Sequence, residues 1–215
     1  MTEKIVCFDI EAENTGSDVR RDNKRIISIQ LYNQDIEEIY YDDSTEKNIE
    51  LGKKRIQSLL NDGYTLIGYY ISRYDIPLLK EFLELEIPPQ KYIDIAFMNK
   101  VEKIKNNSGY RLQDVCNAVD VSCNHKKLLE PIVEKLKRDP EIIERAKIEG
   151  SKMASKNSRT LQYCCDRALD RICGGTAIFQ LYQEFVKSNG SHNSNFYKYA
   201  MGDVKTEYAL FQKIK

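Results

Sequence analysis

Residues 4–11 read KIVCFDIE, and this stretch decides the fold that the sequence predicts. Its β-branched and aromatic residues are typical of a buried strand, which ends in carboxylates before the turn-prone residues 14–16. Successive side chains of a strand point to opposite faces, so Asp9 and Glu11 are expected on one face. They could be ordinary loop acids, or a cation or divalent metal could neutralise their repulsion. Hard oxygen ligands favour Mg²⁺ or Mn²⁺.

Four further strands and two helices follow along the first half of the chain. The alternation of apolar and polar residues predicts strands, and a Ser/Thr cap or an early proline predicts the start of each helix. Three strands in succession indicate an antiparallel meander, and the helices that follow indicate a mixed α/β fold. The expected strands are residues 25–32, 36–41, 65–68 and 91–97, and the expected helices are residues 45–60 and 77–85.

From residue 111 onward the pattern is almost wholly helical. The longest polar interruption is residues 187–195, which could be a lid, a linker or a long turn. We expect one domain over residues 1–215, with residues 126–186 as a helical elaboration within it. The expected helices are residues 111–119, 126–137, 140–156, 160–173, 177–186 and 196–215.

The composition of the chain limits the class of protein but does not identify its substrate. The chain has 215 residues, 41% of them apolar, and no apolar run long enough to span a bilayer. No signal-peptide pattern opens it, so we expect a soluble, cytoplasmic protein with its six cysteines reduced. Basic and acidic residues number 33 each, a balance that neither supports nor excludes a nucleic-acid substrate.

Three more polar residues could carry chemistry. Tyr199 and Asp203 are four residues apart in a helical pattern, so both are expected on one helical face. Gly202 weakens that helix and indicates a close approach by another group. Asp75 precedes Ile76-Pro77 at a helix start, where aspartate is a common N-cap. Taken alone, these residues could equally be a core tyrosine, a solvated charge and a cap.

Three stretches in order resemble the motifs of the DEDD superfamily of 3′→5′ exonucleases. The resemblance is to the exonuclease domain of family B DNA polymerases and its stand-alone relatives, in the branch that carries tyrosine in the third motif. It spans about residues 4–214 and is weakest between residues 116 and 196. The stretches are FDIE at residues 8–11, GYYISRYDIPLL at residues 68–79 and YAMGD at residues 199–203.

The resemblance implies an RNase H-like fold, with a five-stranded mixed sheet flanked by helices. It also implies metal-dependent removal of nucleotides from a 3′ end, more in keeping with single-stranded DNA than with RNA. Two Mg²⁺ or Mn²⁺ ions would serve phosphodiester hydrolysis, and Tyr199 would orient the attacking water. The implied metal ligands are Asp9, Glu11, Asp75 and Asp203.

Two positions depart from the family's pattern and affect the expected grip on substrate. Tyr70 replaces the asparagine of the second motif, and Ala12 replaces the small hydroxyl residue that often follows the first. Tyr70, Arg73, Tyr74 and Ala12 are therefore the expected substrate contacts, although packing or solvation would also explain the tyrosines and the arginine.

Several alternatives remain open at this stage. The same site could serve an exoribonuclease, or it could be vestigial in a nucleic-acid-binding or assembly module. A polymerase or repair partner is possible, and the sequence leaves the oligomeric state open. Cys116, Cys123 and His125 could bind structural zinc, although their spacing matches no common knuckle. No phosphate-binding loop or dinucleotide-binding turn is present in the sequence.

Overall fold

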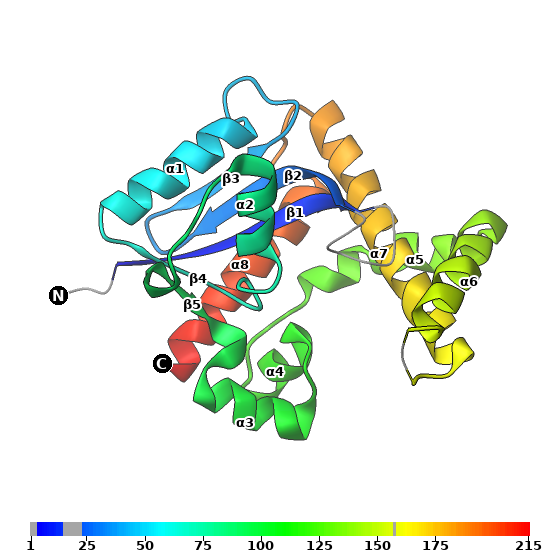
Figure 1. Cartoon of the computed structure of the whole chain (residues 1–215). Coiled ribbons are helices and arrows are strands. Elements are labelled where there is room, and N and C mark those ends of the chain that lie inside the picture. Colours follow the sequence, from blue (N-terminus) through cyan, green and yellow to red (C-terminus); the bar gives the residue numbers. More distant parts are fainter. Residues whose placement is uncertain (1–3, 15–22, 157) are drawn as a thin grey trace. The chain divides into compact units, whose positions relative to one another are not determined.

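The computed structural model describes residues 4–14, 23–156 and 158–215. A five-stranded mixed sheet lies at its centre, in the order β3-β2-β1-β4-β5. β1 pairs in parallel with β4, β4 pairs in parallel with β5, and β2 pairs antiparallel with β3. The strands, drawn as arrows in Figure 1, are β1 (Ile5–Asn14), β2 (Asn23–Tyr32), β3 (Glu37–Tyr41), β4 (Thr65–Gly68) and β5 (Tyr92–Asp94).

Helices make up most of the remaining described chain. No described helix is both long and apolar enough to cross a membrane. The α-helices are α1 (Ile49–Asn61), α2 (Asp75–Leu83), α3 (Asn99–Ser108), α4 (Leu112–Ala118), α5 (Glu130–Leu136), α6 (Pro140–Ala154), α7 (Leu161–Lys187) and α8 (Asn195–Ile214). The short 3₁₀ helices are η1 (Pro89–Lys91), η2 (Ile95–Phe97) and η3 (His125–Leu128).

The chain divides into two compact units. The first comprises Met1–Glu11, Ile26–His125 and Tyr197–Lys215, and the second comprises Ala12–Arg25 and Lys126–Phe196. The first unit therefore contains most of the sheet, and the second contains α5, α6 and α7. The expectation of one domain with an elaboration over residues 126–186 stays a prediction.

In the first unit, α1 and α8 cover opposite faces of the sheet (Figure 1). Gly52 of α1 lies against Ile29 of β2 and Tyr40 of β3. On α8, Tyr208 contacts Tyr32 of β2, and Tyr197 and Lys205 both donate hydrogen bonds to Glu37 of β3. Ile29 and Tyr32 differ in parity along β2, as do Tyr40 and Glu37 along β3, so each pair points to opposite faces.

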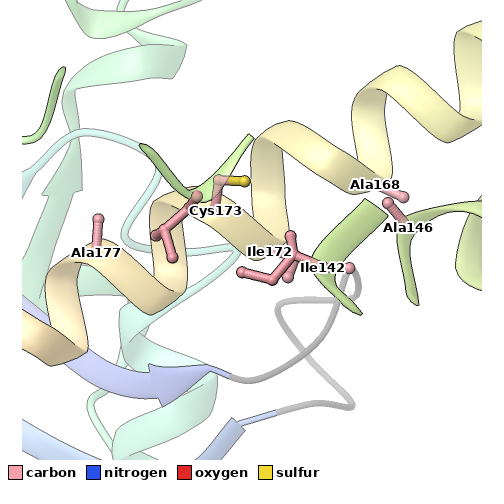
Figure 2. Packing of buried hydrophobic residues seen from close by; sticks show 7 residues of the cluster. Ile142, Ala146, Ala168, Ile172, Cys173 and Ala177 are labelled. Carbon is pink, nitrogen blue, oxygen red and sulfur yellow. The ribbon is translucent and has the colours of Figure 1, made fainter. Parts of the chain in front are cut away.

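The second unit has a small apolar core of its own, shown in Figure 2. Pro140 starts α6 next to Asp139, whose side chain accepts hydrogen bonds from the amides of Glu141 and Ile142. Thr160 caps α7 in a similar way. The core side chains come from the end of α5 and from facing positions of α6 and α7: Leu136, Ile142, Ala146, Ala168, Ile172, Cys173 and Ala177.

The observed elements confirm the predicted α/β class and the five strands, with several corrections. Residues 99–108 form α3, which the sequence did not lead us to expect. The two helices expected over residues 160–173 and 177–186 are one helix, α7. The strand expected over residues 91–97 is only β5, because Asp94 caps η2 there. The helix expected from residue 45 starts at Ile49, after the Asn48 cap.

Candidate active site

β1 delivers two carboxylates to the sheet face that α8 covers. Cys7 of β1 lies 3.5 Å from the Glu207 carboxylate of α8, so the side chains of alternate residues from Cys7 onward point toward this helix. Asp9 and Glu11 follow at that spacing. Gly68, at the end of neighbouring β4, keeps this region compact, because a Cβ there would lie 2.8 Å from the Phe8 carbonyl and 3.3 Å from Glu207.

α8 brings a third carboxylate to the pair on β1. Asp203 and Tyr199 lie one turn apart on this helix, and both are buried. Asp9, Glu11 and Asp203 each offer an oxygen atom, and these atoms lie within 4.8 Å of one another. Among the residues that the structure describes, this is the one group of three or more such side chains placed to hold a metal ion.

Asp75 joins this group by contacting Asp9, not by capping its own helix. The N-cap of α2 is Tyr74, which makes no side-chain cap, and Asp75 is the first helical residue. Its Oδ1 accepts a hydrogen bond of 3.2 Å from the Ile10 amide of β1. Its carboxyl group also forms a hydrogen bond with the Asp9 side chain. The capping alternative is therefore wrong, and Asp75 lies beside the β1 acids.

Burial and neighbouring acids raise the pKa of Asp9, and burial raises that of Asp75. Burial raises the pKa of Asp9 well above its usual range, and the charges of Asp75 and Glu11 raise it further. Burial also raises the pKa of Asp75 to about 7, although the hydrogen bond from the Ile10 amide opposes this shift. Such a group holds its negative charges together only at a cost, which a divalent cation would remove. The donors are all hard carboxylate oxygens, so they fit Mg²⁺ or Mn²⁺.

His125 is a site residue that the sequence did not place here. Its Nε2 lies 2.9 Å from Asp203 Oδ1, and both side chains are almost fully buried. Its Nδ1 lies 3.4 Å from the Thr206 hydroxyl, and its ring contacts the Tyr199 ring at 6.0 Å. Gly202 allows this approach, because a Cβ there would lie 2.5 Å from the His125 Cβ. Gly202 thus indicated in the sequence that another group lies close to α8, but it did not identify that group as His125.

The alternative of a structural zinc site at Cys116, Cys123 and His125 has no support in this arrangement. A hydrogen bond between the Cys116 and Cys123 side chains raises the pKa of Cys116, and burial raises it further. The His125 ring nitrogens instead contact Asp203 and Thr206. Among the described residues, these two cysteines belong to no group placed to hold a metal ion.

The expected substrate contacts fall on two segments. Tyr70, Arg73 and Tyr74 lie in the turn between β4 and α2, and their exposure rises from half-buried Tyr70 to exposed Arg73 and Tyr74. Tyr70 has a φ of 64°, a left-handed conformation that is unusual for a bulky residue. Its amide donates to Asp94 Oδ1 at 2.9 Å, which holds the turn in place. Ala12 is half-buried in β1 directly after Glu11.

The mixed sheet and its acidic group define an RNase H-like domain of the nuclease type. A family model described as the RNase H superfamily matches residues 6–129, which is more than half of the chain. The chain belongs to the RNase H superfamily. The matched segment carries Asp9, Glu11, Asp75 and His125, whereas Tyr199 and Asp203 lie beyond it. A search of curated proteins found no match.

Proposed function

We propose that this protein is a metal-dependent 3′→5′ exonuclease that removes nucleotides from the 3′ end of single-stranded DNA. The observation that carries the proposal is the gathering of Asp9, Glu11 and Asp203 oxygens within 4.8 Å, with Asp75 hydrogen-bonded to Asp9. The order of the three exonuclease-like motifs supports the direction of degradation, and membership of the RNase H superfamily supports nucleic-acid hydrolysis.

In this proposal the four carboxylates hold two Mg²⁺ or Mn²⁺ ions. When bound, such ions stabilise the attacking and departing oxygens of a phosphodiester displacement. The chain's own contribution is to keep the ligands in place before metal arrives. The Ile10 amide holds one oxygen of Asp75, and His125 holds one oxygen of Asp203.

Tyr199 is proposed to orient the attacking water. A phenol with an ordinary pKa of about 10 is a poor base at neutral pH, so its use is as a hydrogen-bonding group. Its place one turn before Asp203 puts it on the same helical face as a proposed metal ligand. Tyr70, Arg73, Tyr74 and Ala12 are proposed to contact the terminal nucleotides.

Two other functions would use the same residues. An exoribonuclease would have the same carboxylates, and only its contacts to the sugar would differ. A binding or assembly module would retain the fold but neither bind metal at these acids nor cleave. A polymerase or repair partner is compatible with all three functions.

The decisive experiment is time-resolved digestion of end-labelled single-stranded DNA and RNA of matched sequence with Mg²⁺ or Mn²⁺. We expect a DNA ladder that shortens from the 3′ end and is lost with EDTA, in Asp9→Asn and in Asp203→Asn. Glu81→Gln, which alters an exposed acid of α2, is the matched control and should keep full activity. RNA cleavage alone would establish the exoribonuclease.

Calorimetric titration with Mn²⁺ separates the enzyme from the binding module. Wild type should bind Mn²⁺ and Asp9→Asn should bind it far more weakly. A folded wild type that neither binds Mn²⁺ nor cleaves either substrate would contradict the proposed activity.

A further inference from the structure

A set of aromatic rings begins next to the acidic group and continues across the first unit. Tyr74, directly before Asp75, contacts Tyr70 edge to face at 6.5 Å between ring centroids. Tyr70 in turn contacts Phe97 of η2 at 5.6 Å. Tyr110, between α3 and α4, completes the set, which we call the aromatic track: Tyr74, Tyr70, Phe97 and Tyr110.

The aromatic track is unusually exposed for large side chains. Tyr74 is 40% exposed, Phe97 is 39% exposed and Tyr110 is 62% exposed. Single exposed apolar residues are ordinary, but rings that follow one another over a surface indicate a binding site. Their exposure leaves ring area on which another planar group could stack.

Two cations lie against these rings. The Arg73 guanidinium lies 4.7 Å from the Phe97 centroid and 5.5 Å from that of Tyr70. The Lys105 ammonium lies 5.2 Å from Tyr70, 5.2 Å from Phe97 and 5.8 Å from Tyr110. Cation–π contacts of this kind fix the rings and give the surface a positive charge.

Lys105 indicates the charge of the ligand more strongly than Arg73 does, because Lys105 is only 5% exposed. Its ammonium donates to the Ala96 carbonyl, and within the described ranges it forms no ion pair with a carboxylate. A buried charge without an opposite charge is costly, so this site favours an anion nearby. The chemistry therefore matches a ligand that combines planar rings with negative charge.

The backbone beneath the track is held by hydrogen bonds rather than left to adjust. The Asp94 carboxylate accepts from the amides of Tyr70, Ser72 and Ala96 and from the Ser72 hydroxyl. These bonds hold Tyr70 in its left-handed conformation, which would otherwise be strained. The Tyr69 hydroxyl donates to the Tyr110 carbonyl at 2.8 Å and ties the far end of the track to its start.

We infer that the aromatic track binds unpaired nucleotides, with bases on the Phe97 and Tyr110 rings and phosphates near the exposed Arg73. Stacking on aromatic rings reads no particular base and requires bases that are not paired. This inference deepens the proposed function, on which it rests, by adding Phe97 and Tyr110 to the substrate contacts and by giving the strand a route to Asp75. Binding can be measured without cleavage, so the two ideas fail separately.

The test is fluorescence anisotropy of a labelled oligothymidylate with EDTA present, compared with a duplex of equal length. Phe97→Ala and Tyr110→Ala should each weaken single-strand binding by roughly 5- to 100-fold. Tyr110→Phe should restore it, because the ring remains. Tyr163→Ala is the matched control, since Tyr163 of α7 is 47% exposed and has Arg159 over its ring at 5.5 Å. It should bind as wild type does.

Salt dependence separates the roles of the rings and the cations. Arg73→Ala should reduce the slope of log affinity against log salt concentration by about 1, whereas Phe97→Ala should leave it unchanged. Wild-type affinity in folded Phe97→Ala and Tyr110→Ala would overturn the inference, as would equal affinity for the duplex. A wild-type protein that binds oligothymidylate but cleaves neither DNA nor RNA would instead overturn only the proposed function.

Discussion

At the scale of single residues, His125 is the residue that positions a proposed metal ligand, Asp203. Its ring nitrogen contacts Asp203 from outside the acidic group, at 2.9 Å and out of solvent. Groups that hold metal ligands in this way affect metal affinity without touching the ion. No spacing in the sequence could reveal this pair, because 78 residues separate its members.

We expect His125→Ala to weaken Mn²⁺ binding by about 10- to 100-fold, because Asp203 loses the partner that orients it. His125→Gln should recover part of that loss, since glutamine can place an amide donor near the position of Nε2. Calorimetric titration with Mn²⁺ measures both variants. Unchanged affinity in a folded His125→Ala protein would show that His125 does not position Asp203.

Asp75 gives the metal-free protein a specific pH dependence. Its pKa is about 7 in the folded chain, against about 3.9 for an unfolded aspartate. Between these values the folded state holds a proton that the unfolded state has lost, so the free energy of unfolding falls as pH rises from about 4 to about 7.

In EDTA, Asp75→Asn should therefore unfold at a higher temperature than wild type at about pH 8, by at least about 2 °C. The difference should shrink as the pH is lowered toward about 5. Thermal unfolding followed by circular dichroism measures this, with Glu81→Gln as the exposed-acid control. A constant difference across the pH range would mean that the Asp75 carboxylate is not destabilised in the fold.

At the scale of elements, two helical glycines have opposite roles. A Cβ on Gly202 of α8 would lie 2.5 Å from His125, whereas a Cβ on Gly174 of α7 would meet nothing within 4 Å. Gly202→Ala should thus weaken Mn²⁺ binding as His125→Ala does. Gly174→Ala should raise stability by about 0.5–1 kcal/mol, because alanine favours helix. Thermal unfolding and Mn²⁺ titration of both variants test the contrast.

The sequence predicted the strands and helices that follow from a local residue pattern. Its predictions were wrong where contacts between distant residues determine the secondary structure. The alternation around residues 25–41 and the motif at residues 8–11 predicted strands that the structure contains. The predicted break in α7 falls at Gly174 and Gly175, but Ile172, Cys173 and Ala177 are buried on both sides of them. Their packing outweighs a glycine cost of about 1 kcal/mol each.

Asp75 shows the same limit within the candidate site. Its place before Ile76-Pro77 is equally typical of an N-cap and of a motif residue, so local pattern left both open. The hydrogen bond from Ile10, which is 65 residues away, decides between them. The sequence likewise indicated only two members of the aromatic track, Tyr70 and Tyr74, because Phe97 and Tyr110 lie outside every motif.

At the scale of the whole molecule, the two units should respond separately to core damage. Ile172 packs in the core of the second unit, while the four acids and His125 belong to the first. Ile172→Ala should destabilise the second unit by about 2–5 kcal/mol and leave Mn²⁺ affinity unchanged. Hydrogen exchange of α6 and α7 amides measures the first effect, and calorimetry measures the second.

Ile56→Ala is the matched control for this prediction. Ile56 is fully buried in α1 of the first unit, so its loss should leave exchange in α6 and α7 unchanged. If Ile172→Ala abolished Mn²⁺ binding in a protein whose first unit remained folded, the acidic group would depend on the second unit.

The acidic group joins β1 to α8, and 194 residues separate Asp9 from Asp203. A ribosome translates β1 before α8, so the three-carboxylate group cannot assemble until α8 has also left the exit tunnel. A nascent chain that already displays the sheet therefore lacks a complete set of acids, and so does any product truncated before residue 203. The chain can therefore gain the proposed activity only after translation has passed residue 203.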